Sequence, residues 1–80
     1  MTIEQIITEN KLHVSHGEIR LGTENSWDAE RYSIYESLRA YIVPNSGTSR
    51  NLGRCYNEYS FTVNDGTSEY VVVYSVDSSD

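Results

Sequence analysis

The first apolar residues of the chain repeat with helical spacing. Ile3, Ile6 and Ile7 fall at positions i, i+3 and i+4, and together they form one apolar face. Thr2 and Gln5 have the spacing of a capping box, in which each side chain satisfies an amide that the first turn leaves unpaired. The pattern predicts a short helix over residues 2–10, which must dock on another element because a helix of this length is marginally stable alone.

Apolar and polar residues then alternate from position 12 to position 21, as in a half-buried hairpin. A two-residue turn at His16-Gly17 pairs Val14 with Ile19. This register places four apolar side chains on one face of the hairpin: Leu12, Val14, Ile19 and Leu21.

Helical periodicity returns after a polar loop at residues 22–26. One stripe is formed by Trp27, Ile34, Tyr35, Leu38, Tyr41 and Ile42. We expect Asn25 or Ser26 to cap this long helix, with Asp28 and Glu30 in its first turn. Pro44 should end the helix near residues 41–43, because the residue before a proline is pushed out of helical geometry.

The C-terminal part contains two alternating runs, 55–63 and 68–76, around an Asp65-Gly66 turn signal. A two-residue turn pairs Phe61 with Tyr70. The inner face of the hairpin then carries Tyr59, Phe61, Val63, Tyr70, Val72, Tyr74 and Val76. The outer face carries Tyr56, Glu58, Ser60, Thr62, Glu69, Val71, Val73 and Ser75.

The intervening residues 45–54 contain two glycines, two serines and two asparagines without apolar alternation, which is typical of a flexible surface loop. The order of elements is therefore α-β-β-α-β-β. It predicts an α+β domain over residues 1–80, in which two antiparallel hairpins form a four-stranded sheet and the long helix packs on one face. Residues 77–80 form a short acidic tail.

Composition excludes several classes of function. Eighty residues suffice for one domain but leave no room for a deep cleft with a second functional layer, so we expect no enzyme and no cofactor. No apolar run approaches the length of a membrane span, and the lone Cys55 suits a reducing compartment, so a soluble cytoplasmic protein is expected. Alternation places Cys55 on the inner face as a small buried hydrophobe. His13, His16 and Glu18 lack further ligands nearby, which argues against a metal site.

The charge of the chain gives the strongest functional indication. Formal net charge is −6, and residues 55–80 contain five acids and no base. Direct binding to nucleic acid needs clustered lysine and arginine and is not expected. The acids serve solubility alone, or they steer a partner with a basic surface. Candidate partner-binding residues are Tyr56, Glu58, Asp65, Glu69, Val71, Val73 and Asp77.

An apolar strip formed by Tyr56, Val71 and Val73 has two interpretations. The N-terminal helix covers it, or it is an interface. The first functional hypothesis is a non-enzymatic acidic module that inhibits a larger protein with a basic, nucleic-acid-handling surface by mimicking nucleic acid. The alternative is an adaptor that self-associates through this strip, so that the chain is a monomer or a weak homodimer.

In its size, its acidity and its lack of motifs, the whole chain resembles phage-encoded inhibitors of host defence, anti-CRISPR proteins among them. The resemblance implies that the partner is a CRISPR effector or another nucleic-acid-binding protein.

Overall fold

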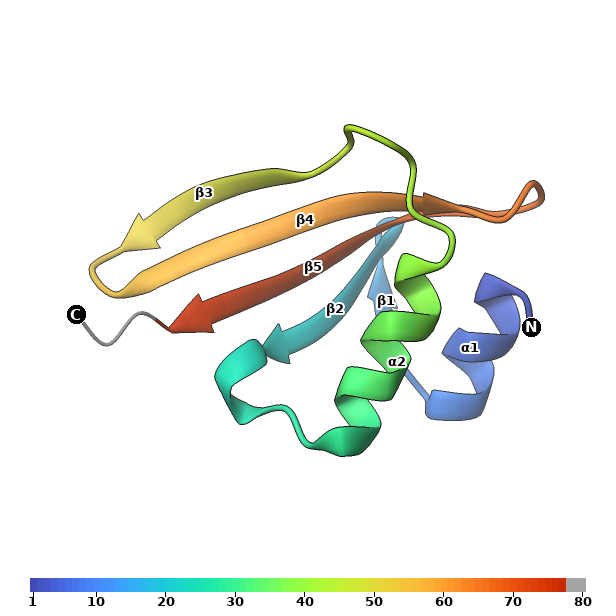
Figure 1. The fold of residues 1–80 in the computed structure, drawn as a ribbon, viewed down its shortest axis with the longest axis horizontal. Coiled ribbons are helices and arrows are strands. Elements are labelled where there is room, and N and C mark those ends of the chain that lie inside the picture. Colours follow the sequence, from blue (N-terminus) through green and yellow to red (C-terminus); the bar gives the residue numbers. More distant parts are fainter. Residues whose placement is uncertain (78–80) are drawn as a thin grey trace.

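The computed structural model describes residues 1–77. Its elements, in chain order, are α1 (Ile3–Asn10), β1 (His13–Ser15), β2 (Glu18–Thr23), the 3₁₀ turn η1 (Glu24–Ser26), α2 (Ala29–Arg39), β3 (Thr48–Gly53), β4 (Tyr56–Asn64) and β5 (Glu69–Asp77). The strands form one five-stranded sheet in the order β1-β2-β5-β4-β3, and both helices lie on one side of it (Figure 1). The α+β class is confirmed, whereas the prediction of a four-stranded antiparallel sheet is wrong. Of the predicted acidic tail, only Asp77 belongs to the described residues.

The two hairpins are joined by a parallel pairing between β2 and β5. Ile19 lies opposite Val72, and Arg20 lies opposite Val73. The carbonyl of Gly17 accepts a hydrogen bond from the amide of Val71 at 2.9 Å, at the start of this pairing. The N-terminal hairpin itself has the predicted register, with Val14 opposite Ile19.

Helix α1 begins and ends as the sequence predicts. The Thr2 hydroxyl accepts the amide of Gln5 at 3.2 Å, and the Gln5 side chain accepts the amide of Thr2 at 2.7 Å. Lys11 follows Asn10 in left-handed geometry with φ 52° and closes the last turn. Ile3 and Ile6 are buried, so the apolar face docks on the rest of the core.

Helix α2 is shorter than predicted at both ends. Its N-cap is Asp28, whose carboxylate accepts the amide of Arg31 at 2.9 Å, and not Asn25 or Ser26. Trp27 lies before the helix in extended geometry, where its indole N–H donates to the carbonyl of Leu21 at 2.9 Å. The helix ends at Arg39, well before Pro44. The predicted core residue Ile42 lies beyond the helix, where it pairs with Val63 in an isolated β-bridge, and it is exposed.

The hairpin of β4 and β5 has a four-residue turn at 65–68. Asn64 lies opposite Glu69, and Phe61 lies opposite Val72, so the predicted pairing is wrong by two residues. The Asp65 carboxylate causes the wider turn, because it accepts the amides of Thr67 and Ser68 at 2.9 and 2.8 Å. A shift of two residues preserves the side-chain alternation, so the inner and outer faces of the hairpin remain as predicted.

Residues 48–53 form strand β3 at the edge of the sheet, so the prediction of a flexible loop over 45–54 is wrong for these six residues, whereas residues 45–47 and 54 lie outside the strands. All six residues of β3 are exposed. A strand without a buried face needs no apolar alternation, because its ladder with β4 and side-chain pairs such as Thr48 with Ser60, 2.6 Å apart, hold it in place. Cys55 lies in the turn after β3 with φ 66° and is exposed, so its predicted burial is also wrong.

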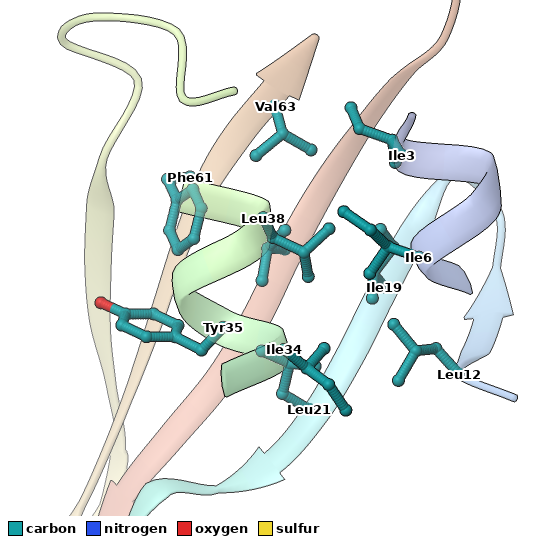
Figure 2. Close-up of a cluster of buried hydrophobic side chains, with 11 residues drawn as sticks. Ile3, Ile6, Leu12, Ile19, Leu21, Ile34, Tyr35, Leu38, Phe61 and Val63 are labelled. Carbon is teal, nitrogen blue, oxygen red and sulfur yellow. The ribbon is translucent and has the colours of Figure 1, made fainter. Parts of the chain in front are cut away.

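The hydrophobic core lies between the helices and the sheet (Figure 2). Its buried residues are Ile3, Ile6, Leu12, Ile19, Leu21, Ile34, Tyr35, Leu38, Phe61, Val63 and Val72. Because α1 packs into the same core as α2, it does not cover the opposite face of the sheet. Of the two interpretations of the strip around Val71 and Val73, coverage by the N-terminal helix is thereby excluded.

Candidate protein-binding face

The sheet face opposite the helices, here called the open face, carries most of the predicted site. Side chains of paired residues point to the same side of a sheet, so the registers assign the members of this face. On the last two strands they include Tyr56, Glu58, Ser60, Thr62, Glu69, Val71, Val73, Ser75 and Asp77. From β2 and β3 the registers add Glu18, Arg20, Thr48 and Arg50. Six of the seven predicted partner-binding residues therefore share one face, and Asp65 is the exception.

The centre of the open face is apolar. Val71 is half-buried, and Val73 is only 6% exposed although no helix covers it. A hollow of ≈ 260 Å³ lies over the two valines, bordered by polar and charged side chains of β2, β3 and β4. Tyr56 and Leu52, which are 42% and 49% exposed, extend the apolar surface toward the far end of the sheet.

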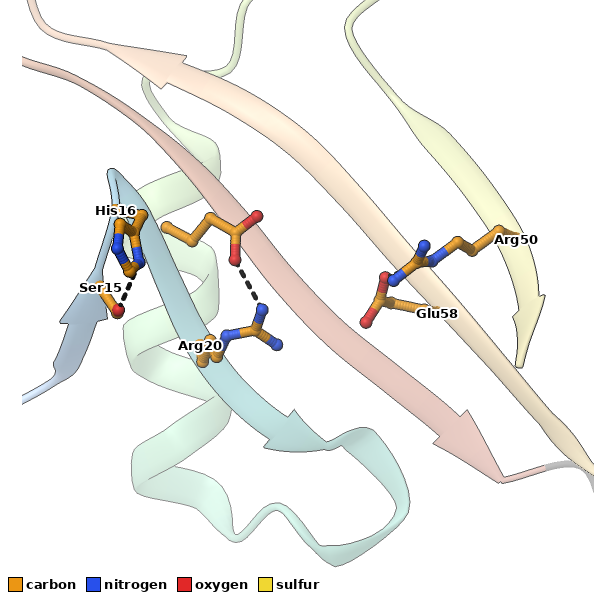
Figure 3. Close-up of polar contacts among 6 residues, drawn as sticks. Ser15, His16, Arg20, Arg50 and Glu58 are labelled. Atoms are coloured by element: carbon orange, nitrogen blue, oxygen red, sulfur yellow. Dashed lines mark hydrogen bonds and ion pairs between the residues drawn. The ribbon is translucent and has the colours of Figure 1, made fainter. Parts of the chain in front are cut away.

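Two ion pairs flank the valines (Figure 3). Arg20 contacts Glu18 at 2.6 Å along β2, and Arg50 of β3 contacts Glu58 of β4 at 2.9 Å. Residues 55–80 contain no base that could neutralise the acids of the C-terminal hairpin locally. For Glu58 a base comes from outside this segment, because β3 places Arg50 directly opposite it.

Acids nevertheless exceed bases on the open face. The face has a formal charge of −2, because it carries two bases, Arg20 and Arg50, and four acids: Glu18, Glu58, Glu69 and Asp77. Glu69 and Asp77 lie at the two ends of β5 and are exposed. The open face thus has an apolar centre between two ion pairs, and an exposed carboxylate at each end of β5.

Asp65 has a structural role beyond the turn that the sequence indicated. Besides holding its own turn, its carboxylate accepts the amide of Ile3 at 3.0 Å and so joins the turn to the N-terminus of α1. Hydrogen bonds from the amides of Ser68, Ile3 and Thr67 lower the pKa of Asp65 below its ordinary value. Its carboxylate oxygens are already engaged within the domain, which distinguishes it from the acids of the open face.

An aromatic cluster lies on the helix side of the sheet, and the sequence did not indicate that its members contact one another. Trp27 and Tyr35 each contact Tyr74, and Tyr59 stacks on Tyr74 with centroids 5.6 Å apart. Burial, and then the hydrogen bond with Tyr35, raise the pKa of Tyr74. Beside the cluster, a hollow of ≈ 440 Å³ opens between the end of α2 and strands β3 and β4, with Arg39 at its border.

Arg39 is tied to this cluster. Its guanidinium donates to the Tyr35 hydroxyl at 2.8 Å and lies 5.6 Å from the centroid of that ring. The signal was present in the sequence, since Tyr35 and Arg39 are four residues apart on one helix. The contact raises the pKa of Arg39. Because an arginine stays protonated in proteins, its guanidinium is a permanent positive charge at the border of the hollow.

One serine and one histidine are in contact at the exposed turn of the N-terminal hairpin. Ser15 Oγ lies 3.0 Å from His16 Nδ1, but the two residues are chain neighbours at an exposed turn and line none of the hollows described above. Within residues 1–77, no group of three or more histidine, cysteine or acidic side chains is placed to hold a metal ion.

In the described part of the chain, no helix has the length and apolar character needed to cross a membrane. In comparisons with known proteins, no family model, no curated protein and no solved structure matches this chain.

Proposed function

We propose that the protein is a non-enzymatic binding module that docks through its open face on a larger protein with a basic surface. The observation that carries the proposal is the uncovered face itself, where an apolar centre at Val71 and Val73 lies between exposed carboxylates. Interfaces commonly combine such a desolvated centre with a polar rim. Tyr56 lies on the same face and is the aromatic residue best placed as an anchor.

Charge supports a basic partner. The net charge of −6 attracts a basic surface at long range, and Glu69 and Asp77 can contact it at short range. Basic grooves are typical of proteins that handle nucleic acid, because they must attract phosphate. A module that occupies such a groove inhibits the nucleic-acid-binding protein, and this is the mode of action we propose. By analogy with phage-encoded inhibitors, a CRISPR effector is one such partner.

The test distinguishes an effect of the open face on binding from an effect of the net charge. The tagged protein captures partners from the lysate of cells infected by candidate phages, beside two double variants. One is Glu69→Lys with Asp77→Lys on the open face. The other is Glu9→Lys with Glu36→Lys on exposed helix positions, which produces the same net charge.

The first double variant should lose the nucleic-acid-binding partner, whereas the second should retain it at physiological salt. Added nucleic acid should compete with the wild-type protein for that partner. Equal capture by all three proteins, or no competition, would refute docking of the open face on a basic groove.

Self-association is the second candidate, and the exposure of Tyr56 and Leu52 beside the valines favours it. Two open faces packed together would bury both ion pairs, which is unfavourable unless the charges of the two copies complement each other. Sedimentation at increasing protein and salt concentrations distinguishes the candidates. A dimer that is lost in Val71→Lys identifies the adaptor, whereas a monomer at all concentrations supports the inhibitor.

A further inference from the structure

Strand β3 is the last strand of the sheet, and its outer edge is not paired with another strand of the described chain. The direction of its backbone groups follows from β4. The amide of Thr62 donates to Ser46 Oγ at 3.0 Å, and its carbonyl accepts the amide of Val43 at 2.9 Å. These partners precede β3 in the chain and lie on its side of β4.

Backbone groups of a strand alternate between its two neighbours, so Ser60 and Glu58 also direct theirs toward β3. Their partners, Thr48 and Arg50, therefore form the hydrogen bonds of the ladder. It follows that Ser49 and Asn51 direct their N–H and C=O groups away from the sheet. Four backbone groups are available there to one more strand.

The surroundings of this edge are basic in an otherwise acidic protein. Arg50 lies on β3 and Arg54 in the turn that follows it, while Arg39 and Ser49 border the same hollow on the helix side. Glu58, on the open face, accepts the Nε–H of Arg50, whose side chain stays 71% exposed. An arginine has five N–H donors, so Arg50 can bind a second carboxylate.

We propose that β3 is a docking edge for an extended acidic segment of a partner protein, which adds to the sheet as a sixth strand. This surface goes beyond the proposed open-face function and has the opposite charge. Backbone hydrogen bonds to Ser49 and Asn51 supply affinity, and the arginines select acidic side chains. A second copy of the chain fits less well, because antiparallel pairing centred on residues 49, 50 or 51 places the two Arg50 side chains directly or diagonally opposite each other.

The register of an antiparallel sixth strand makes the proposal specific. Residues opposite Ser49 and Asn51 exchange backbone hydrogen bonds with β3 and point toward the helix side. The residue between them lies opposite Arg50 on the open face, and this is the position at which an acid is required. The bulge between Asn51 and Gly53 limits the pairing to a short segment, which suits a peptide better than a continuous sheet.

The probe is a seven-residue capped peptide with the sequence Thr-Glu-Val-Glu-Val-Glu-Thr, titrated into the isotopically labelled full chain. Amide resonances of Ser49 and Asn51 should shift, and their exchange with deuterated water should slow, with a dissociation constant of about 1 mM or less. A peptide with lysine in place of glutamate should bind at least about tenfold more weakly. Equal binding of the lysine peptide, or no change at the two amides, would overturn the proposal.

Backbone pairing is tested by methylation of the peptide. N-methyl groups on the two valines remove the donors that face β3 and should abolish binding, whereas N-methyl groups on the two outer glutamates should leave it largely intact. Unchanged binding of the valine-methylated peptide would show that the contact is not a sixth strand.

The protein side has a matched pair of substitutions. Arg50→Gln should weaken binding about tenfold, and Arg20→Gln, in the other ion pair of the open face, should leave it unchanged. Equal effects of the two would refute selection by Arg50. A single-stranded oligonucleotide that shifts the same amides while the acidic peptide does not would also overturn the proposal. Because Glu69 and Asp77 are not involved, failure here is distinguishable from failure of the open-face function.

Discussion

Removing the side chain of Leu38 should test the core most directly. Leu38 is fully buried, and it points from α2 toward the sheet between residues of α1 and β4 (Figure 2). Leu38→Ala deletes three carbon groups, whose transfer to water is worth about 2.4 kcal/mol at roughly 0.8 kcal/mol each. A residual cavity of roughly 50–100 Å³ adds about 1–2 kcal/mol, because neighbours on separate elements cannot all collapse into it.

The expected loss of about 4 kcal/mol is large for this chain. Stability of roughly 0.05–0.15 kcal/mol per residue gives a domain of this length about 4–12 kcal/mol in total. Leu52→Ala is the matched control, since the same atoms are removed from a side chain that is 49% exposed and no cavity is left. Its expected loss is about 1 kcal/mol or less. Leu38→Met, which nearly conserves volume, should lose less than about 1.5 kcal/mol and keeps the test usable if Leu38→Ala does not fold.

The assay is urea unfolding followed by the fluorescence of the single tryptophan. Trp27 packs against three tyrosines, so its emission should change when the aromatic cluster separates. A lower midpoint with an unchanged slope reports a loss of stability alone. A loss below about 1 kcal/mol for Leu38→Ala, or equal losses for the two alanine variants, would show that the assigned core face is wrong.

Three further predictions concern turns and edges. The pKa of Asp65 is lowered in the folded state, so its contribution to stability is present above the ordinary carboxyl pKa and is lost as pH falls through the folded pKa. Asp65→Asn should therefore flatten the acid limb of a plot of unfolding free energy against pH. An unchanged acid limb would contradict the lowered pKa. Gly66 has φ 92°, so Gly66→Ala should destabilise by about 1–2 kcal/mol, while Gly47→Ala should be nearly neutral in thermal melts; similar effects would place the strain elsewhere. Limited trypsin digestion should cut after Arg54 in the turn before it cuts after Arg50, whose backbone is in the ladder, and the reverse order by mass spectrometry would contradict strand β3.

Much of the candidate site could be predicted because a strand directs its side chains with a period of two. The sequence placed Tyr56, Glu58, Val71 and Val73 on one face, and this survived an error of two residues in the register. The charges around these residues could not be predicted, because Arg50 reaches Glu58 from a strand that the sequence did not indicate. Asp65 was assigned to the partner surface from its charge alone, whereas its hydrogen bonds depend on where α1 docks.

By itself the sequence determined the features that depend on neighbours in the chain: the capped helix α1, the N-terminal hairpin and the buried faces of α2, β4 and β5. Local hydrogen bonds and apolar periodicity are sufficient to specify these features. Only the tertiary structure decided that β2 and β5 pair in parallel, that residues 48–53 form an edge strand and that one face of the sheet stays uncovered. These features depend on pairing between distant segments, and an edge strand with no buried face leaves no hydrophobic pattern in the sequence from which to read it.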